Sequence, residues 1–117
     1  MKTLLHVEDE PSIQSGFAFL CKDLEIQVLM AMSLKEALEH LANIDYKIDA
    51  IIWDGKLPDG FSPETIRQVR ASGYVGPMAA NSGDNNLLKE QMKAGCTVKS
   101  GKHMSPLDIL RALGLLE

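Results

Sequence analysis

Short, continuous apolar runs recur along the chain and alternate with longer segments in which the apolar residues are spaced apart. The runs are shorter than helices and are bounded by polar or turn-forming residues. This pattern is typical of strands that are buried on both faces of a sheet. The predicted strands span residues 3–7, 26–30, 50–53 and 77–80, with a fainter one at 96–98.

The longer segments have the period of an amphipathic helix. In the first of them, apolar residues fall at i, i+4, i+7, i+8 and i+11, which places them on one stripe, and the second has a similar spacing. The predicted stripes are Ile13, Phe17, Leu20, Cys21 and Leu24 in the first helix and Leu34, Ala37, Leu38 and Leu41 in the second.

Capping residues mark where the helices begin and end. Serine is a favoured N-cap and proline is tolerated at the first helical position. A fourth helix is predicted between Gly83 and Gly95, because glycine readily adopts the left-handed conformation that closes a helix. The predicted starts are Ser33 for the second helix, Ser62 with Pro63 for the third, and Ser105 with Pro106 for the last.

Strands and helices therefore alternate as βαβαβαβαβα. Parallel neighbours need a crossover connection, so this order predicts an α/β fold with a doubly wound, parallel sheet and helices on both faces. Ligands bind at the carboxyl ends of the strands in such folds. Residues 1–117 are expected to form a single domain.

Charge and cysteine content narrow the function classes. The formal net charge of -4 is the opposite of the basic surface that direct nucleic-acid binding needs. Cys21 and Cys96 lack the spacing of a metal or redox pair and are expected to be reduced and buried. No apolar run approaches the length of a membrane span, and no signal peptide precedes the first strand. A cytoplasmic protein that begins at Met1 is expected.

Acidic residues follow the first and third predicted strands. Glu8, Asp9 and Glu10 end the first, and Asp54 ends the third. If these strands are neighbours, the carboxylates converge and need a cation, and a site of carboxylate oxygens suits Mg²⁺. A simpler alternative is that Asp9 or Glu10 only stabilises the N-terminus of the following helix.

These residues also carry a resemblance to a known family. Residues 5–11 (Leu-His-Val-Glu-Asp-Glu-Pro), 51–54 (Ile-Ile-Trp-Asp) and 57–60 (Leu-Pro-Asp-Gly) together resemble the signature of response-regulator receiver domains. The resemblance implies a flavodoxin-like fold with strand order 2-1-3-4-5. It implies that Asp54 is the phosphoacceptor, and that Glu8, Asp9, Asp54 and the backbone carbonyl of Lys56 bind Mg²⁺.

The resemblance also implies partners. Asp54 would take a phosphoryl group from a phosphohistidine of a sensor histidine kinase or a histidine phosphotransfer protein. The result is a self-phosphorylating switch rather than a turnover enzyme, and an unknown downstream protein would detect it by contact.

Two further residues complete the implied site. Ser82 falls where receivers carry the hydroxyl that binds the phosphoryl group, although Asn81 or a plain turn are alternatives. Lys102 falls where receivers carry the lysine that pairs with the acceptor and then with the phosphoryl group, with Lys99 as a weaker candidate.

The chain departs from the family pattern at two positions, and its segment from Ser82 to Gly95 is slightly shorter than in most receivers. His103 stands where receivers have a proline in a cis peptide, and Lys99 stands where they commonly have an aromatic switch residue. Lys56 and Asp84 flank the phosphoryl position, and we expect them to pair and hinder attacking water.

The departures favour an alternative, a degenerate receiver that acts as an interaction module without phosphorylation. A phosphatase of the haloacid-dehalogenase type is disfavoured, because Lys56 stands where such enzymes need an acidic residue. Flavin binding is disfavoured because residues 8–10 are acidic where a phosphate would have to bind.

Overall fold

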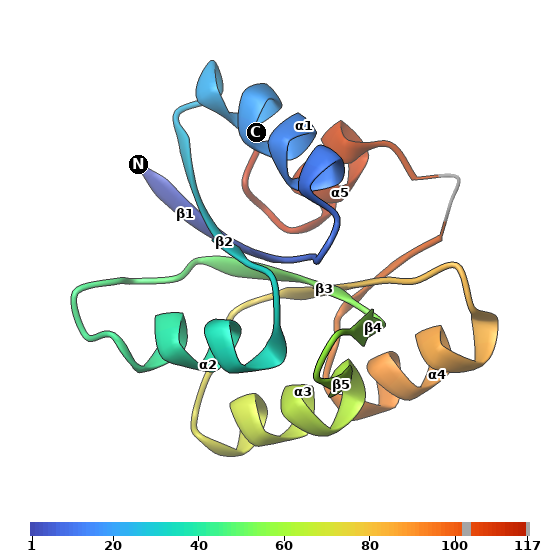
Figure 1. Ribbon diagram of the computed structural model, residues 1–117. Coiled ribbons are helices and arrows are strands. Elements are labelled where there is room, and N and C mark those ends of the chain that lie inside the picture. Colours follow the sequence, from blue (N-terminus) through green and yellow to red (C-terminus); the bar gives the residue numbers. More distant parts are fainter. Residues whose placement is uncertain (102–103, 117) are drawn as a thin grey trace.

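The computed structural model describes residues 1–101 and 104–116, which form a central parallel sheet covered by helices on both faces (Figure 1). The strands of this sheet are β1 (Lys2–Val7), β2 (Ile26–Ala31), β3 (Ala50–Asp54), β6 (Met78–Asn81) and β7 (Val98–Ser100). The helices are α1 (Pro11–Lys22), α2 (Leu34–Ala42), α3 (Ser62–Ala71), α4 (Asn85–Ala94) and α5 (Pro106–Ala112).

The sheet order is β2-β1-β3-β6-β7, with every neighbouring pair parallel. Numbered within the sheet alone, this is the predicted 2-1-3-4-5 order, and the doubly wound α/β prediction is confirmed. Helices α1 and α5 cover one face, and α2, α3 and α4 cover the other (Figure 1).

A small hairpin between β3 and α3 escaped the sequence analysis. Strands β4 (Lys56–Leu57) and β5 (Gly60–Phe61) pair antiparallel and form a separate two-stranded sheet. Both oxygens of Asp59 in its turn accept hydrogen bonds from the first turn of α2, from Leu34 N at 2.9 Å and from Lys35 N at 3.0 Å. The hairpin is therefore fastened to the start of a neighbouring helix.

Side chains from alternate positions of the strands form two apolar cores. One lies under α2, α3 and α4 and includes Trp53, which is fully buried. The other lies under α1 and α5 and includes Phe17 and Cys21. Both cysteines are buried and form no disulfide, as expected.

The predicted stripe of α1 is wrong at its first position. Ile13 is 40% exposed, whereas the neighbouring Gln14 is buried. The amide of Gln14 donates to the carbonyl oxygen of Ala31 at the end of β2, at 3.1 Å, which gives a polar side chain a partner inside the fold. Leu38 of α2 is likewise more exposed than its spacing predicted.

Predicted strand and helix boundaries shift by one or two residues. β6 and β7 each begin later than the apolar runs that predicted them. Ser33 and Ser105 cap their helices as predicted, by accepting from Glu36 N and Asp108 N. Ser62 does not cap α3: it is the first helical residue, and Phe61 occupies the N-cap position.

His6 is fully buried in the middle of β1 and packs on the ring of Phe17. A mid-strand histidine is expected to be a hydrogen-bonded residue in or near the core; His6 is in the core, but neither ring nitrogen has a hydrogen-bond partner among the described residues. Burial lowers the pKa of His6 to about 4, so the ring is neutral near pH 7.

Candidate functional site

The acidic residues after β1 and β3 lie at the same edge of the sheet. These strands pair in parallel, with Val7 opposite Trp53, so the residues that follow leave the sheet side by side. Carboxylate oxygens of Glu8, Asp9 and Asp54 all lie within 4.8 Å of one another. The structure therefore brings together three of the residues that the sequence pattern singled out.

Glu10 stands apart from this cluster. It occupies the N-cap position of α1, although its side chain caps no backbone amide. The N-terminal alternative therefore applies to Glu10 alone. Glu8 is only 5% exposed and its Oε2 accepts from the backbone N–H groups of Asp9, at 2.9 Å, and Glu10, at 3.3 Å.

Burial and neighbouring carboxylates raise the proton affinity of Glu8 and Asp54. Burial and the neighbouring Asp54 raise the pKa of Glu8 to about 8. The pKa of Asp54 is also raised, chiefly by burial. None of the four ion pairs formed by the described residues includes these carboxylates. A proton or a bound cation must offset their charge.

Hydrogen bonds hold the backbone around Asp54. Gly55 N donates to Asp54 Oδ1 at 2.7 Å, and Ser62 N donates to the carbonyl oxygen of Gly55 at 2.9 Å. The side chain of Gln91, on α4, donates to the carbonyl oxygens of Trp53 and Asp54. Sequence reasoning missed this part of the site, although a glutamine three residues after the apolar Leu88 was the available signal.

Ser82 lies beside the acceptor loop. A Cβ atom added to Gly55 would come within 2.9 Å of Ser82 Oγ and would overlap the side chain of Leu87. A larger residue at position 55 would require the side chains of Leu87 and Ser82 to shift. Asn81 is also at this edge, because it pairs in register with Asp54. Ser82 and Asn81 both remain candidates for contact with a phosphoryl group.

The predicted pairing of Lys56 with Asp84 is wrong. Asp84 is the N-cap of α4, and its Oδ1 accepts from Asn86 N at 2.9 Å and Leu87 N at 3.1 Å. These backbone N–H groups have no acceptor within the helix, so they bind the Asp84 carboxylate, which makes no ion pair with Lys56. No ion pair joins Lys56 to Asp84 in the described part of the chain.

Of the two lysines considered for pairing with Asp54, only Lys99 lies among the described residues. Lys102, with the adjoining His103, lies outside the described residues. Lys99 is an exposed residue of β7, where it pairs in register with Ala80. The three residues of β7, Val98, Lys99 and Ser100, include no aromatic side chain.

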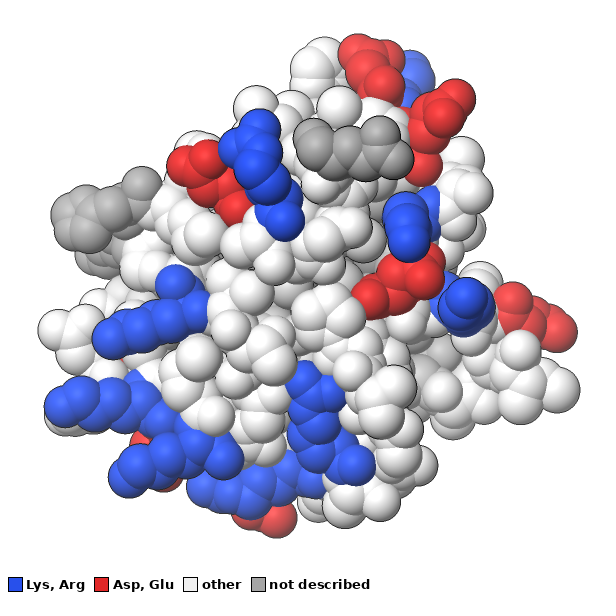
Figure 2. All heavy atoms as spheres, turned by 180° about the vertical axis from the view of Figure 1, so that it is seen from behind, with Lys and Arg blue, Asp and Glu red and all other residues white. Residues whose placement is uncertain are grey.

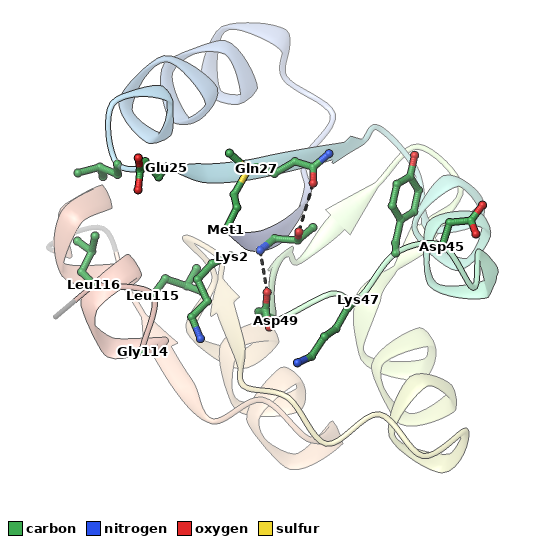
Figure 3. A pocket seen from close by; sticks show the side chains of 13 residues that line it. Met1, Lys2, Glu25, Gln27, Asp45, Lys47, Asp49, Gly114, Leu115 and Leu116 are labelled. Carbon is green, nitrogen blue, oxygen red and sulfur yellow. Dashed lines mark hydrogen bonds between the residues drawn. The ribbon is translucent and has the colours of Figure 1, made fainter.

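A large hollow lies at the opposite edge of the sheet, near the start of β1 (Figure 3). It measures about 900 Å³, and Lys2, Lys47, Glu25 and Asp49 line it. Basic and acidic side chains are mixed here, and Asp49 Oδ2 accepts a hydrogen bond from Thr3 N at 2.8 Å. Among the described residues, the cluster of three carboxylates at the other edge has no counterpart here.

Basic side chains gather on the lower part of the face seen in Figure 2, the end of the molecule at which α3 and α4 lie. The exposed basic residues of these helices include Arg67, Lys89 and Lys93. Acidic residues interrupt them: Arg67 pairs with Glu64 and Glu90, and Lys93 also pairs with Glu90. The surface is therefore not the continuous basic stripe that nucleic-acid backbones require.

No described helix is both long and apolar enough to cross a lipid bilayer.

No family model and no curated protein sequence matches the chain. Solved structures do. A response regulator receiver domain (CheY-like) from Methylobacillus flagellatus aligns with 26% identity over 100% of this chain and 99% of that chain, with a TM-score of 0.82. The chain therefore has the fold of response-regulator receiver domains.

Two further structures support the same fold. The chemotaxis protein CheY4 of Vibrio cholerae has 23% identity, covers 100% of this chain and 99% of that chain, and gives a TM-score of 0.84. A CheY-like receiver domain from Methanospirillum hungatei JF-1 has 20% identity, covers 97% of this chain and 91% of that chain, and gives a TM-score of 0.86. The acidic cluster of Glu8, Asp9 and Asp54 thus lies on a receiver fold at the edge where α/β sheets bind ligands.

Proposed function

We propose that this chain is a phosphoacceptor receiver of a two-component or phosphorelay system, in which Asp54 accepts a phosphoryl group from a phosphohistidine. The observation that carries the proposal is the convergence of Asp54 with Glu8 and Asp9 at the carboxyl ends of β1 and β3, within 4.8 Å of one another. The receiver fold supports it.

The donor set fits Mg²⁺. The three clustered carboxylates form no ion pair with any described residue and supply hard oxygen ligands, which this ion prefers. Glu8, Asp9 and Asp54 would hold the ion, together with the backbone carbonyl of Lys56. When bound, Mg²⁺ offsets the negative charge that would otherwise repel an incoming phosphoryl group.

In the proposed reaction, a carboxylate oxygen of Asp54 forms a bond to phosphorus while the bond from phosphorus to the imidazole nitrogen breaks. The imidazole, which belongs to the partner, keeps the electron pair and takes up a proton from water. Gly55 N–H fixes the rotation of the Asp54 carboxylate through its bond to Oδ1. Catalysis of this kind rests on positioning and electrostatics rather than on an acid–base residue.

Ser82 is proposed to bind the phosphoryl group after transfer, and Lys102 to pair with it. The donor would be a sensor histidine kinase or a histidine phosphotransfer protein, and an unidentified protein would read the phosphorylated state by contact. The domain acts on itself as a switch and is proposed to do so in the cytoplasm.

A second candidate function is a degenerate receiver that binds a partner without being phosphorylated. The exposed Lys99 in place of a switching aromatic favours it, as does His103 in place of proline. The retained carboxylate cluster favours phosphorylation.

Phosphoryl transfer distinguishes the two functions. Wild type, Asp54→Asn and Asp45→Asn are incubated with acetyl phosphate, in Mg²⁺ or in EDTA, and intact mass is recorded. Asp45 is an exposed residue at the opposite edge, so its variant is the matched control. Phosphoacceptor function predicts one added phosphoryl group in Mg²⁺ for wild type and Asp45→Asn, and none for Asp54→Asn or in EDTA. An unmodified wild type in Mg²⁺ would instead support the degenerate receiver.

A further inference from the structure

The backbone that carries Asp54 is held by a buried side chain from another helix. Gln91 projects from α4 and is fully buried. Its Nε2 lies within hydrogen-bond distance of three acceptors, between which its two hydrogens are shared: the carbonyl oxygen of Trp53 at 3.1 Å, that of Asp54 at 3.2 Å, and Ser62 Oγ at 3.0 Å. One amide group thus joins the end of β3, the start of α3 and the middle of α4.

The contact with the Asp54 carbonyl bears directly on the carboxylate. In a planar trans peptide, the C=O and N–H groups point in opposite directions. The Asp54 carbonyl faces Gln91, so the N–H of Gly55 faces the other way, where it donates to Asp54 Oδ1 at 2.7 Å. Gln91 therefore determines where this N–H group points.

A second path runs through Ser62. Its Oγ accepts from Gln91, while its backbone N–H donates to the carbonyl oxygen of Gly55 at 2.9 Å. Three successive carbonyl groups, from Trp53 to Gly55, are thus held either by Gln91 itself or by the residue that Gln91 binds. The acceptor loop has little freedom to rotate as a result.

Packing alone does not account for Gln91. Its Oε1 is buried and has no hydrogen-bond partner among the described residues, an arrangement that costs free energy. An apolar side chain of the same length would fill the space without that cost. The contribution that distinguishes glutamine here is the Nε2 donor.

We propose that Gln91 is a positioning residue of the receiver site: its side-chain amide orients the 54–55 peptide so that Gly55 N–H holds the Asp54 carboxylate ready for phosphoryl transfer. This inference rests on the proposed phosphoacceptor function for its kinetic consequence, whereas its structural consequence can be measured without phosphorylation. Gln91 is not proposed to contact the phosphoryl group or the side chains of the metal ligands. It acts on Asp54 only through the backbone.

The test compares three variants with the wild type. Gln91→Met keeps the length of the side chain and removes the donor. Ser62→Ala removes one acceptor and leaves both carbonyl contacts of Gln91 in place. Lys89→Met, at an exposed position of the same helix, is the matched control.

Two quantities are measured: the rate constant of phosphorylation by acetyl phosphate at saturating Mg²⁺, and the hydrogen-exchange rate of the Gly55 amide by NMR. Gln91→Met should slow phosphorylation by about tenfold or more and accelerate Gly55 exchange by a similar factor, because the donor is misaligned rather than lost. Ser62→Ala should have a smaller effect in the same direction, and Lys89→Met should match the wild type.

A phosphorylation rate and a Gly55 exchange rate for Gln91→Met within about twofold of wild type would overturn the proposal. A fall in melting temperature with both rates unchanged would show a purely structural role and would overturn it too. If Gln91→Met does not fold, Gln91→Leu, which also lacks the donor, is compared with the wild type by the same two measurements. If the wild type takes up no phosphoryl group, the proposed function fails, and Gly55 exchange still tests the positioning role.

Discussion

The two edges of the central sheet both carry charged side chains, but they differ in how the charges are balanced. At the amino ends of the strands, Lys2 and Lys47 share a hollow of about 900 Å³ with Glu25 and Asp45, and Asp49 accepts a backbone hydrogen bond (Figure 3). At the carboxyl ends, three carboxylates meet with no ion pair to any described residue.

The difference in charge between the two edges indicates which of them is the better candidate for a functional site. The hollow at the amino ends is lined by both basic and acidic side chains, whose opposite charges partly offset one another. Burial, together with neighbouring carboxylates, raises the pKa of Glu8 and of Asp54, so a proton or a cation is bound favourably at this cluster. Unbalanced charge at the ligand-binding edge of an α/β sheet is therefore a better guide to function here than the size of a cavity.

The largest expected effect is on metal binding. Asp54→Asn should weaken Mg²⁺ binding at least about tenfold, because the cluster loses a charged ligand. A MgCl₂ titration followed by the fluorescence of Trp53, which directly precedes Asp54, measures the affinity. Asp45→Asn at the other edge should leave the affinity within about twofold of wild type. An equal loss of Mg²⁺ affinity in both variants would show that the ion does not bind specifically at the carboxyl ends of the strands.

The affinity for Mg²⁺ should also depend on pH. With the pKa of Glu8 at about 8, the metal-free site holds a proton at neutral pH, and this proton must leave when the ion binds. Between pH 6 and 8 the apparent Kd should fall by up to about tenfold per pH unit, and above pH 8 it should level off. Isothermal titration calorimetry at several pH values tests this, and a constant Kd over that range would contradict it.

A smaller effect is expected on stability without metal. The native state raises the pKa of Glu8 above its ordinary value of 4.5, so the folded protein binds this proton more tightly than the unfolded chain. Stability is therefore lost as pH rises from about 4.5 toward 8. Glu8→Gln should raise the unfolding free energy above pH 8 by about 1–2 kcal/mol, since water at this edge screens the repulsion, and should give no gain near pH 4.5.

Urea denaturation in EDTA at both pH values measures this difference. Saturating Mg²⁺ should reverse it, because the wild-type site then gains binding free energy that the variant lacks. A destabilised Glu8→Gln in EDTA above pH 8 would mean that the carboxylates do not repel one another.

The smallest effect concerns His6, which lies on β1 two residues before Glu8 and depends on pH in the opposite direction. Its pKa falls from 6.5 to about 4 on folding, so stability is fully present above pH 6.5 and is lost as pH falls toward 4. His6→Leu should flatten this loss and change the unfolding free energy at pH 7 by about 1 kcal/mol or less. Urea denaturation at pH 7, 6 and 5 checks it; an unchanged slope would show that His6 does not titrate on unfolding in this range.

Much of the fold could be predicted because it depends on local patterns. Strand runs and helical spacing follow from backbone geometry, and crossover rules restrict the ways in which parallel strands can be joined. The position of Asp54 after one strand and of Glu8 and Asp9 after another then places them at one edge of the sheet. The sequence by itself therefore determined the α/β architecture and pointed to this acidic edge.

Only the tertiary structure decided which side chains meet across elements. Periodicity assigns a face to a helix but does not set its rotation and height on the sheet to within one residue. That precision made Gln14 buried and Ile13 exposed. It also made Asp84 the N-cap of α4 rather than a partner of Lys56. The same packing placed the Gln91 amide within hydrogen-bond distance of the Asp54 carbonyl oxygen. A hydrogen bond needs its two atoms at a particular distance and angle, and only the packing of whole elements supplies that geometry.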